Sequence, residues 1–166
     1  MNRPPVDPGP RKIVVPAGAP IEEAASRVGA SCWIELALHQ VITGWLVDEP
    51  DPETSTTFWA LRAHRAQLAE EWHRRLPELR EMPRDGFVVA PRRWGERLSP
   101  GSAFAASADR ANALREVLQD IRDGYLEHQG LAVGPADAPV AETLRRALVV
   151  TDSDLARLAP PTNSQI

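Results

Sequence analysis

The sequence predicts an all-α fold built from four helices, and three observations support this. Apolar residues recur every three to four positions over four long stretches, which is the spacing of one face of a helix. Clusters of proline, glycine and capping residues divide these stretches from one another. The links are short, long and short in that order, which is a helical arrangement with one long connection in its middle.

The first helix is expected over residues 20–47. Pro20 suits a helix start, and Glu22 and Glu23 favour a first turn through the helix dipole. The segment 48–52, with the letters DEPDP, ends this helix because proline disfavours helical geometry in the residue before it.

The second helix is expected over residues 54–79, opened by a threonine or a serine and with a proline near its end. A long link follows at 80–102. The third helix is expected over 103–128 and the fourth over 138–150. The letters TDSD at 151–154 resemble a fresh helix cap, so a separate last turn is expected there.

The length of 166 residues predicts a single domain, and 43% hydrophobic residues are enough for a sizeable core. We expect a proline-rich arm over 1–19, in which KIVV at 12–15 could add a short strand or cover an apolar edge. The helical domain is expected over 20–159 and a C-terminal tail over 160–166.

Several classes of function are disfavoured by composition. The formal net charge is -4 and no dense basic run is visible, so we expect no binding to nucleic acid. The apolar run 33–47 is interrupted by polar residues and is shorter than the roughly 20 residues of a spanning helix, so we expect no membrane insertion. The N-terminus has no apolar core typical of a secretory signal, which predicts a cytoplasmic protein. The single cysteine, Cys32, excludes an internal disulfide and is expected to be a buried apolar residue.

The three segments LALHQVITGWLVDE (36–49), LRAHRAQLAEEWHRRL (61–76) and ANALREVLQDIRDGYLEH (111–128) resemble bacterial ferritin-like domains of the small, Ala/Arg-rich kind. The resemblance lies in texture and helix order and covers roughly residues 21–158. It implies a four-helix bundle with a long crossover between the second and third helices. It also implies a di-iron site, with a Glu on the first and third helices and a Glu-x-x-His on the second and fourth.

The residues of this chain match that ligand pattern poorly. Glu116 and Asp120 point away from the inward stripe of the third helix, and Glu142 is followed at three by Arg145 in place of histidine. The formal Glu-x-x-His at 70–73 begins with a glutamate that lies well off the inward stripe. The metal-ligand set of the family is therefore largely absent.

A polar group nevertheless falls on the inward stripes of the first two helices. Glu35 and His39 share one face, and Arg65 interrupts the stripe of the second helix. If the first turn is centred near residue 52, these side chains lie at a similar height. We expect Glu35, His39 and Arg65 to form a buried polar cluster, since a buried carboxylate needs a partner.

Two alternatives stay open for this region. Glu35, His39, His64 and Glu71 carry two imidazoles and two carboxylates, which suit a single or degenerate site for iron, manganese or zinc. A small-molecule pocket is the other alternative, and its aromatic residues would be Trp33, Trp45, Trp59, Trp72 and Tyr125. His128, near the end of the third helix, is expected to cap that helix.

The preferred interpretation is a ferritin-like helical domain without a complete di-metal site and without a cofactor, acting by binding a partner or itself. The first helix is apolar on its second side too, at Ile34, Ala37, Val41 and Trp45, which predicts a homo-oligomer or a protein partner at this helix. The alternatives are a metal-dependent oxidoreductase with an atypical Glu/His site, and binding of a small molecule. Whether the protein is an enzyme stays open at this stage.

Overall fold

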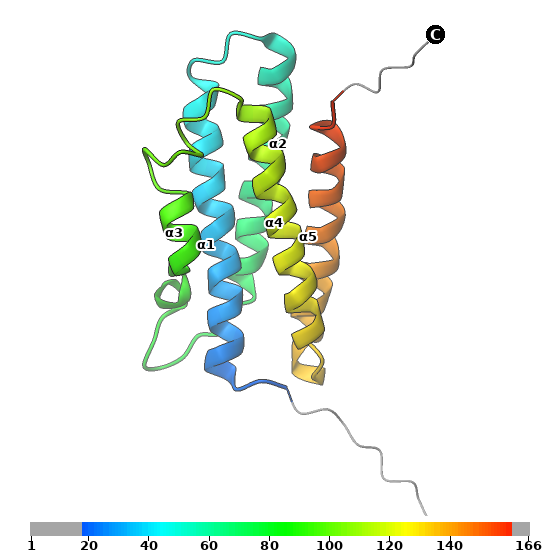
Figure 1. The fold of residues 1–166 in the computed structure, drawn as a ribbon. Helices are drawn as coiled ribbons and strands as arrows, with labels where there is room; N and C mark the ends of the chain where they lie inside the picture. Colours follow the sequence, from blue (N-terminus) through cyan, green and yellow to red (C-terminus); the bar gives the residue numbers. More distant parts are fainter. Residues whose placement is uncertain (1–17, 161–166) are drawn as a thin grey trace, which may run out of the picture.

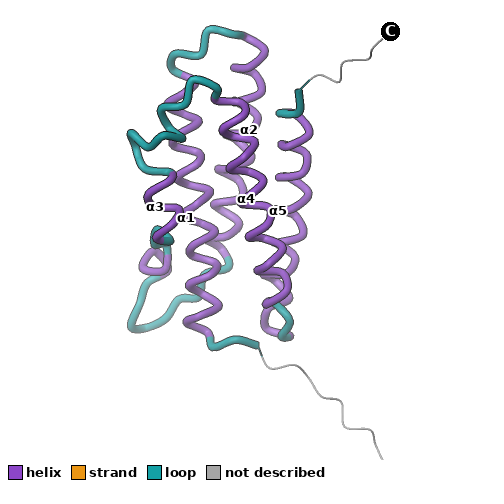
Figure 2. Tube along the Cα trace, in the orientation of Figure 1, coloured by secondary structure: helices purple, strands orange, loops and turns teal. Residues whose placement is uncertain are grey.

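The structure is a computed structural model that describes residues 18–160, and these residues are helical with no strand, as predicted (Figures 1 and 2). Four long helices carry most of the chain, and one short α-helix and two 3-10 turns lie in the links. The predicted arm up to residue 17, with KIVV, and the tail from residue 161 lie outside the described residues. The elements are α1 (Ile21–Leu46), α2 (Pro52–Arg74), η1 (Arg84–Phe87), α3 (Arg92–Arg97), α4 (Arg110–Leu131), η2 (Pro135–Asp137) and α5 (Ala138–Arg157).

The helices α1 and α2 form an antiparallel hairpin. Asp51 caps α2 by accepting a hydrogen bond from the backbone N–H of Thr54 at 2.7 Å, and Pro52 occupies the first helical position, where its missing N–H costs nothing. The hairpin is closely packed, because the Cys32 thiol lies 3.4 Å from the carbonyl of Ala69. Next to this hairpin, α5 lies beside α2 and α4 lies beside α5 (Figure 1).

The second helix ends at Arg74, before the predicted residue 79. Pro77 disfavours helical geometry at Leu76 and has no N–H to donate. The chain instead makes a last tight turn, in which the Leu76 N–H donates to the His73 carbonyl at 3.1 Å. Leu76 then turns into the core, with 2% of its surface exposed.

The third and fourth helices also differ from the predicted bounds. The helix α4 begins at Arg110 because Asp109 accepts a hydrogen bond from the N–H of Asn112 and caps it there. The preceding residues 99–107 form turns, and Gly101 has a φ of 82°. The helix α5 does not break at 151–154 but continues to Arg157, since Thr151 and Asp154 face the interior instead of capping a new helix.

The long link between α2 and α4 covers the second side of α1. The Trp45 indole donates to the carbonyl of Ala105 at 2.8 Å, and its ring meets Phe104 edge-on at 5.1 Å between centroids. Ala37 and Trp45 are buried, and Ile34 and Val41 are half-buried. The apolar side of α1 that the sequence assigned to a partner is therefore covered by the same chain.

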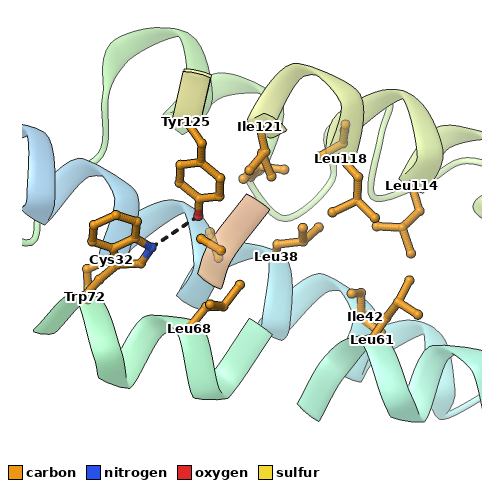
Figure 3. Close-up of a cluster of buried hydrophobic side chains, with 14 of the residues drawn as sticks. Cys32, Leu38, Ile42, Leu61, Leu68, Trp72, Leu114, Leu118, Ile121 and Tyr125 are labelled. Atoms are coloured by element: carbon orange, nitrogen blue, oxygen red, sulfur yellow. Dashed lines mark hydrogen bonds between the residues drawn. The ribbon is translucent and has the colours of Figure 1, made fainter. Parts of the chain in front are cut away.

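The apolar core lies between the long helices (Figure 3). Leu38 and Ile42 of α1 meet Leu61 and Leu68 of α2 and a row of leucines from α4. Each fully buried leucine stabilises the fold by about 1.5–3 kcal/mol relative to an exposed one. Over residues 18–160 the apolar runs of the helices are too short or too broken by charge to span a bilayer.

Candidate functional site: a buried arginine between two carboxylates

The most unusual feature of the interior is the guanidinium of Arg65, which is 0% exposed. Its Nη1 donates to Oε1 of Glu35 at 3.2 Å, and its Nη2 donates to Oδ2 of Asp154 at 2.5 Å. Both carboxylates are also 0% exposed. The arginine of α2 therefore joins α1 to α5 through two fully buried ion pairs.

Three further side chains extend this arrangement. His64 contacts Oδ1 of Asp154 through Nδ1 at 2.7 Å and is partly exposed, so one edge of the arrangement reaches solvent. The Tyr125 hydroxyl of α4 donates to Oε1 of Glu35. We call Glu35, His64, Arg65, Tyr125 and Asp154 the Arg65 network. It contains one residue or more from each of the four long helices.

An aromatic layer closes the network on one side. The Trp72 indole donates to the Tyr125 hydroxyl at 3.3 Å, the contact drawn as a dashed line in Figure 3. The His128 ring stacks on Trp72, with centroids 5.9 Å apart and planes 16° apart. His128 lies in the last turn of α4, where the sequence places it, and its side chain is buried. Its imidazole makes the outer layer over Trp72.

Burial dominates the electrostatics of the network. It raises the pKa of Glu35, and Arg65 and the Tyr125 hydroxyl offset this only in part. Burial also raises the pKa of Tyr125 well above its usual value, and the neighbouring Glu35 carboxylate adds to this. Desolvation acts to lower the pKa of Arg65, but Glu35 and Asp154 outweigh it and the pKa rises. Arg65 therefore keeps its charge, and the network needs it to do so.

Hydrogen bonding within the network is incomplete. Oε2 of Glu35 and Nε of Arg65 are buried and have no hydrogen-bond partner among residues 18–160, and the same holds for Oγ1 of Thr151, one turn before Asp154. A buried polar atom that stays unpaired costs about 1–3 kcal/mol of stability. The Arg65 network therefore consists of buried charges whose hydrogen bonds are not all made, and this lowers its net contribution to stability.

The structure places the predicted residues in different surroundings. Glu35 and Arg65 pair, as the polar cluster requires, but His39 does not join them. Its Nδ1 lies 3.2 Å from the carbonyl of Arg62, on the α2 backbone. His39 turns toward this carbonyl because its position on α1 faces the neighbouring helix rather than the centre of the fold.

The residues proposed as metal ligands are not brought together. Glu35 is held by Arg65, His64 by Asp154, and Glu71 pairs with Arg146 at 3.1 Å near the surface. In the part of the chain that the structure describes, no group of three or more His, Cys, Asp or Glu side chains could hold a metal ion. Between the inward carboxylates of Glu35 and Asp154, the guanidinium of Arg65 already supplies a positive charge.

The aromatic residues predicted to line one pocket are also dispersed. Trp72 and Tyr125 are neighbours, with centroids 5.6 Å apart. Trp45 instead packs between Phe58 and Phe104. Trp33 is half-buried, and Trp59 is 53% exposed on the outer side of α2. These residues therefore belong to separate layers and not to a shared cavity.

Sequence reasoning missed Asp154, which is the second carboxylate of the network. A signal was present, because Leu144, Ala147, Thr151 and Asp154 follow one another at helical spacing and are all buried. The letters TDSD also match a local helix cap, and this match hides the buried stripe of α5 that continues through Thr151 and Asp154.

Comparison of the chain with protein-family models, with curated proteins and with solved structures finds no match. The role of the site is therefore argued from its geometry. Glu35, Arg65 and Asp154 are fully buried, so a substrate could not reach them without opening the helices. Joining the long helices is the action this geometry supports most directly.

Proposed function

We propose that the protein is a ferritin-like four-helix bundle that works by self-association and not by metal chemistry. The observation that carries the first half is the position of Arg65 between Glu35 and Asp154. The resemblance implies metal ions between inward carboxylates, and here an arginine of α2 occupies the space between carboxylates of α1 and α5. With one nitrogen on each carboxylate, the guanidinium supplies the positive charge that a metal would otherwise supply between them.

The second half rests on the outer side of the α1–α2 hairpin. From Val28 to Val47 the only formally charged residue is Glu35, which is buried. The exposed side of α1 in this stretch is therefore uncharged, and α2 continues it with small or aromatic residues. We call this surface the hairpin face; its residues are Trp33, Leu36, Gln40, Gly44 and Val47 of α1 and Trp59, Ala63 and Ala66 of α2.

A second copy of the chain is the partner that this face fits best. Residues 33–47 extend over roughly 21 Å of helix. With two helices side by side, roughly 20 Å across, the face has a plan area of about 420 Å², about half of the ~800 Å² per partner of a stable interface. Pairing about a two-fold axis would place the same uncharged surface on both sides.

Charge supports the same occupant. The chain carries a net charge of -4, so charged surfaces of two copies repel on average, whereas the hairpin face presents little charge to a partner. The one arginine beside this face, Arg62, lies over the ring of Trp59 at 4.1 Å and is partly shielded by it.

The mass of the purified chain in sedimentation equilibrium, measured over a wide concentration range, tests self-association. We expect a dimer that Leu36→Asp converts to monomer. Leu126→Asp on α4 is the matched control, because Leu36 is 41% exposed and Leu126 is 43% exposed. A wild-type chain that stays monomeric at the highest concentration, or equal mass for the two variants, would overturn the proposal.

Elemental analysis of untagged protein tests the alternative of a metal-dependent oxidoreductase. The proposal expects less than one-tenth of an equivalent of iron, manganese or zinc per chain. A near-stoichiometric metal that is lost in His64→Ala or His39→Ala would replace the present proposal with the metal-dependent one. His73→Ala serves as the control, since His73 lies at the far end of α2 against Asp85.

A further inference from the structure

We propose that a groove between the N-terminal half of α1 and the link after α2 binds a small organic cation with an apolar body. The groove has a volume of about 640 Å³. Its walls include Ala30, Leu79, Met82, Phe87 and Val89, and its rim carries Glu22 and Glu81. This inference goes beyond self-association, because the groove shares no residue with the hairpin face.

The apolar character of the walls indicates a ligand that buries hydrocarbon. Met82 is 41% exposed and Val89 is 61% exposed, although both are large apolar side chains in a link. Exposed apolar side chains that converge on one concave surface are typical of ligand sites, and pockets for small molecules have volumes of roughly 300–1,000 Å³. The flexible thioether of Met82 can adapt to ligands of different shape.

The acidic residues at the rim of the groove favour a positively charged ligand. Among residues 18–160, neither Glu22 nor Glu81 has an ion-pair partner, whereas their neighbours Glu23 and Glu78 pair with arginines. Within the described part of the chain, no lysine, arginine or histidine lines the groove. Two carboxylates that no described basic residue pairs with, beside an apolar surface, favour a cation such as a primary or quaternary amine over an anion or a neutral molecule.

The far wall of the groove is fixed to α1. A Cβ atom on Gly29 would lie 1.9 Å from the carbonyl oxygen of Phe87, so η1 rests directly on the helix backbone at this glycine. The link is also tied to the end of α2, where His73 contacts Asp85 at 2.8 Å. A pre-formed site binds more tightly because little ordering is needed on binding.

Isothermal titration with three probes of equal chain length tests the proposal on the full chain. The probes are octylamine, octanoate and octanol at pH 7 and low salt. We expect saturable one-to-one binding of octylamine, at least ten-fold tighter than that of octanoate or octanol. Equal affinity for the three probes, or no saturable binding of octylamine, would overturn the proposal.

Two variants locate the site. The double variant Glu22→Gln/Glu81→Gln should lose at least five-fold in octylamine affinity, and Val89→Arg should abolish binding by placing bulk and positive charge in the groove. The matched controls are Glu53→Gln/Glu96→Gln and Val149→Arg. Glu53 lies in the first turn of α2 as Glu22 does in α1, and Val149 is 70% exposed on α5.

The controls should bind octylamine like the wild type, and the circular dichroism of every variant should match it. Loss of binding in the control variants as well would assign the effect to general charge and overturn the groove as the site. The mass of the ligand-free chain is measured separately, so a failure of self-association and a failure of this groove give different results.

Discussion

Arg65 of α2 and Asp154 of α5 are separated by 89 residues in the chain, yet their side chains lie 2.5 Å apart. Neither residue exposes any surface to solvent. The pair therefore fixes the last helix against the first hairpin. Because Glu35 of α1 holds the other side of the same guanidinium, each of the three residues depends on the other two.

Arg65→Met is expected to lower the free energy of unfolding by about 3–5 kcal/mol. The substitution removes the cation and leaves Glu35 and Asp154 buried without compensation. Urea unfolding followed by circular dichroism measures the change. Arg115→Met, at an exposed position on α4, should change the stability by less than about 0.5 kcal/mol.

Replacing all three charged residues shows whether Arg65→Met is destabilising because it leaves two carboxylates unpaired, or because any substitution of Arg65 disturbs the packing. The variant Glu35→Leu/Arg65→Met/Asp154→Leu removes the charges together, and we expect it to recover most of the stability lost by Arg65→Met alone. A triple variant that is as unstable as the sum of its parts would show that the network contributes more than mutual compensation.

Stability is expected to fall as the pH is lowered below neutrality, with His128 as a cause. Burial lowers the pKa of His128 from 6.5 to about 4, and Arg27 adds to this while Asp137 opposes it. Between these two pH values His128 binds a proton in the unfolded chain but not in the folded chain. The folded state therefore loses stability as pH falls from 6.5 toward 4. Urea midpoints at pH 7.5, 5.5 and 4.5 measure the loss.

His128→Gln should make the urea midpoint less dependent on pH within that window. Glu35 acts in the opposite direction, because burial raises its pKa and its ionisation disfavours the fold as pH rises. Comparison of the wild type with His128→Gln isolates the imidazole from this carboxylate, since both chains keep Glu35. If the urea midpoint of His128→Gln depends on pH as that of the wild type does, the buried imidazole does not cause the loss of stability at acid pH.

The helices could be predicted because their signals are local. The apolar stripes of α1 and α2 and the DEPDP break between them can be recognised within short stretches of sequence. The structure confirms both helices, although α2 ends at Arg74 and not at the predicted residue 79. Glu35 and Arg65 could be paired because a short turn fixes the height of one helix against the other.

The remaining contacts depend on distant parts of the chain. Asp154 resembled part of a cap because aspartate and its Thr and Ser neighbours are preferred cap residues, and only the packing of α5 against α2 shows that Asp154 is buried instead. The contact of the link with α1 could not be predicted either, since the sequence places Phe104 and Ala105 at the start of the third helix whereas the structure has them in turns. The dispersal of the Trp residues has the same cause.

Cys32 is expected to resist thiol reagents in the folded protein. It is 1% exposed, and burial raises the pKa of its thiol to about 11, so very little thiolate exists at neutral pH. Reaction with a chromogenic disulfide reagent should be at least a hundred-fold slower in buffer than in denaturant. A cysteine placed at the exposed Ser153 in a Cys32→Ser background should react at once, and equally fast labelling of native Cys32 would contradict its burial.

Gly29→Ala should lower the free energy of unfolding by about 1–3 kcal/mol, although alanine is the better helix former. The added methyl would collide with the Phe87 carbonyl, which is backbone and cannot turn aside, so η1 must move off α1. Gly124→Ala in α4 is the control, because nothing lies within 4 Å of its Cβ position, and it should stabilise the fold by about 0.5–1 kcal/mol. Thermal unfolding of both variants shows whether each substitution raises or lowers the stability. A stabilising Gly29→Ala would mean that the link does not rest on the helix at this point, and the groove beside it would then lose its fixed wall.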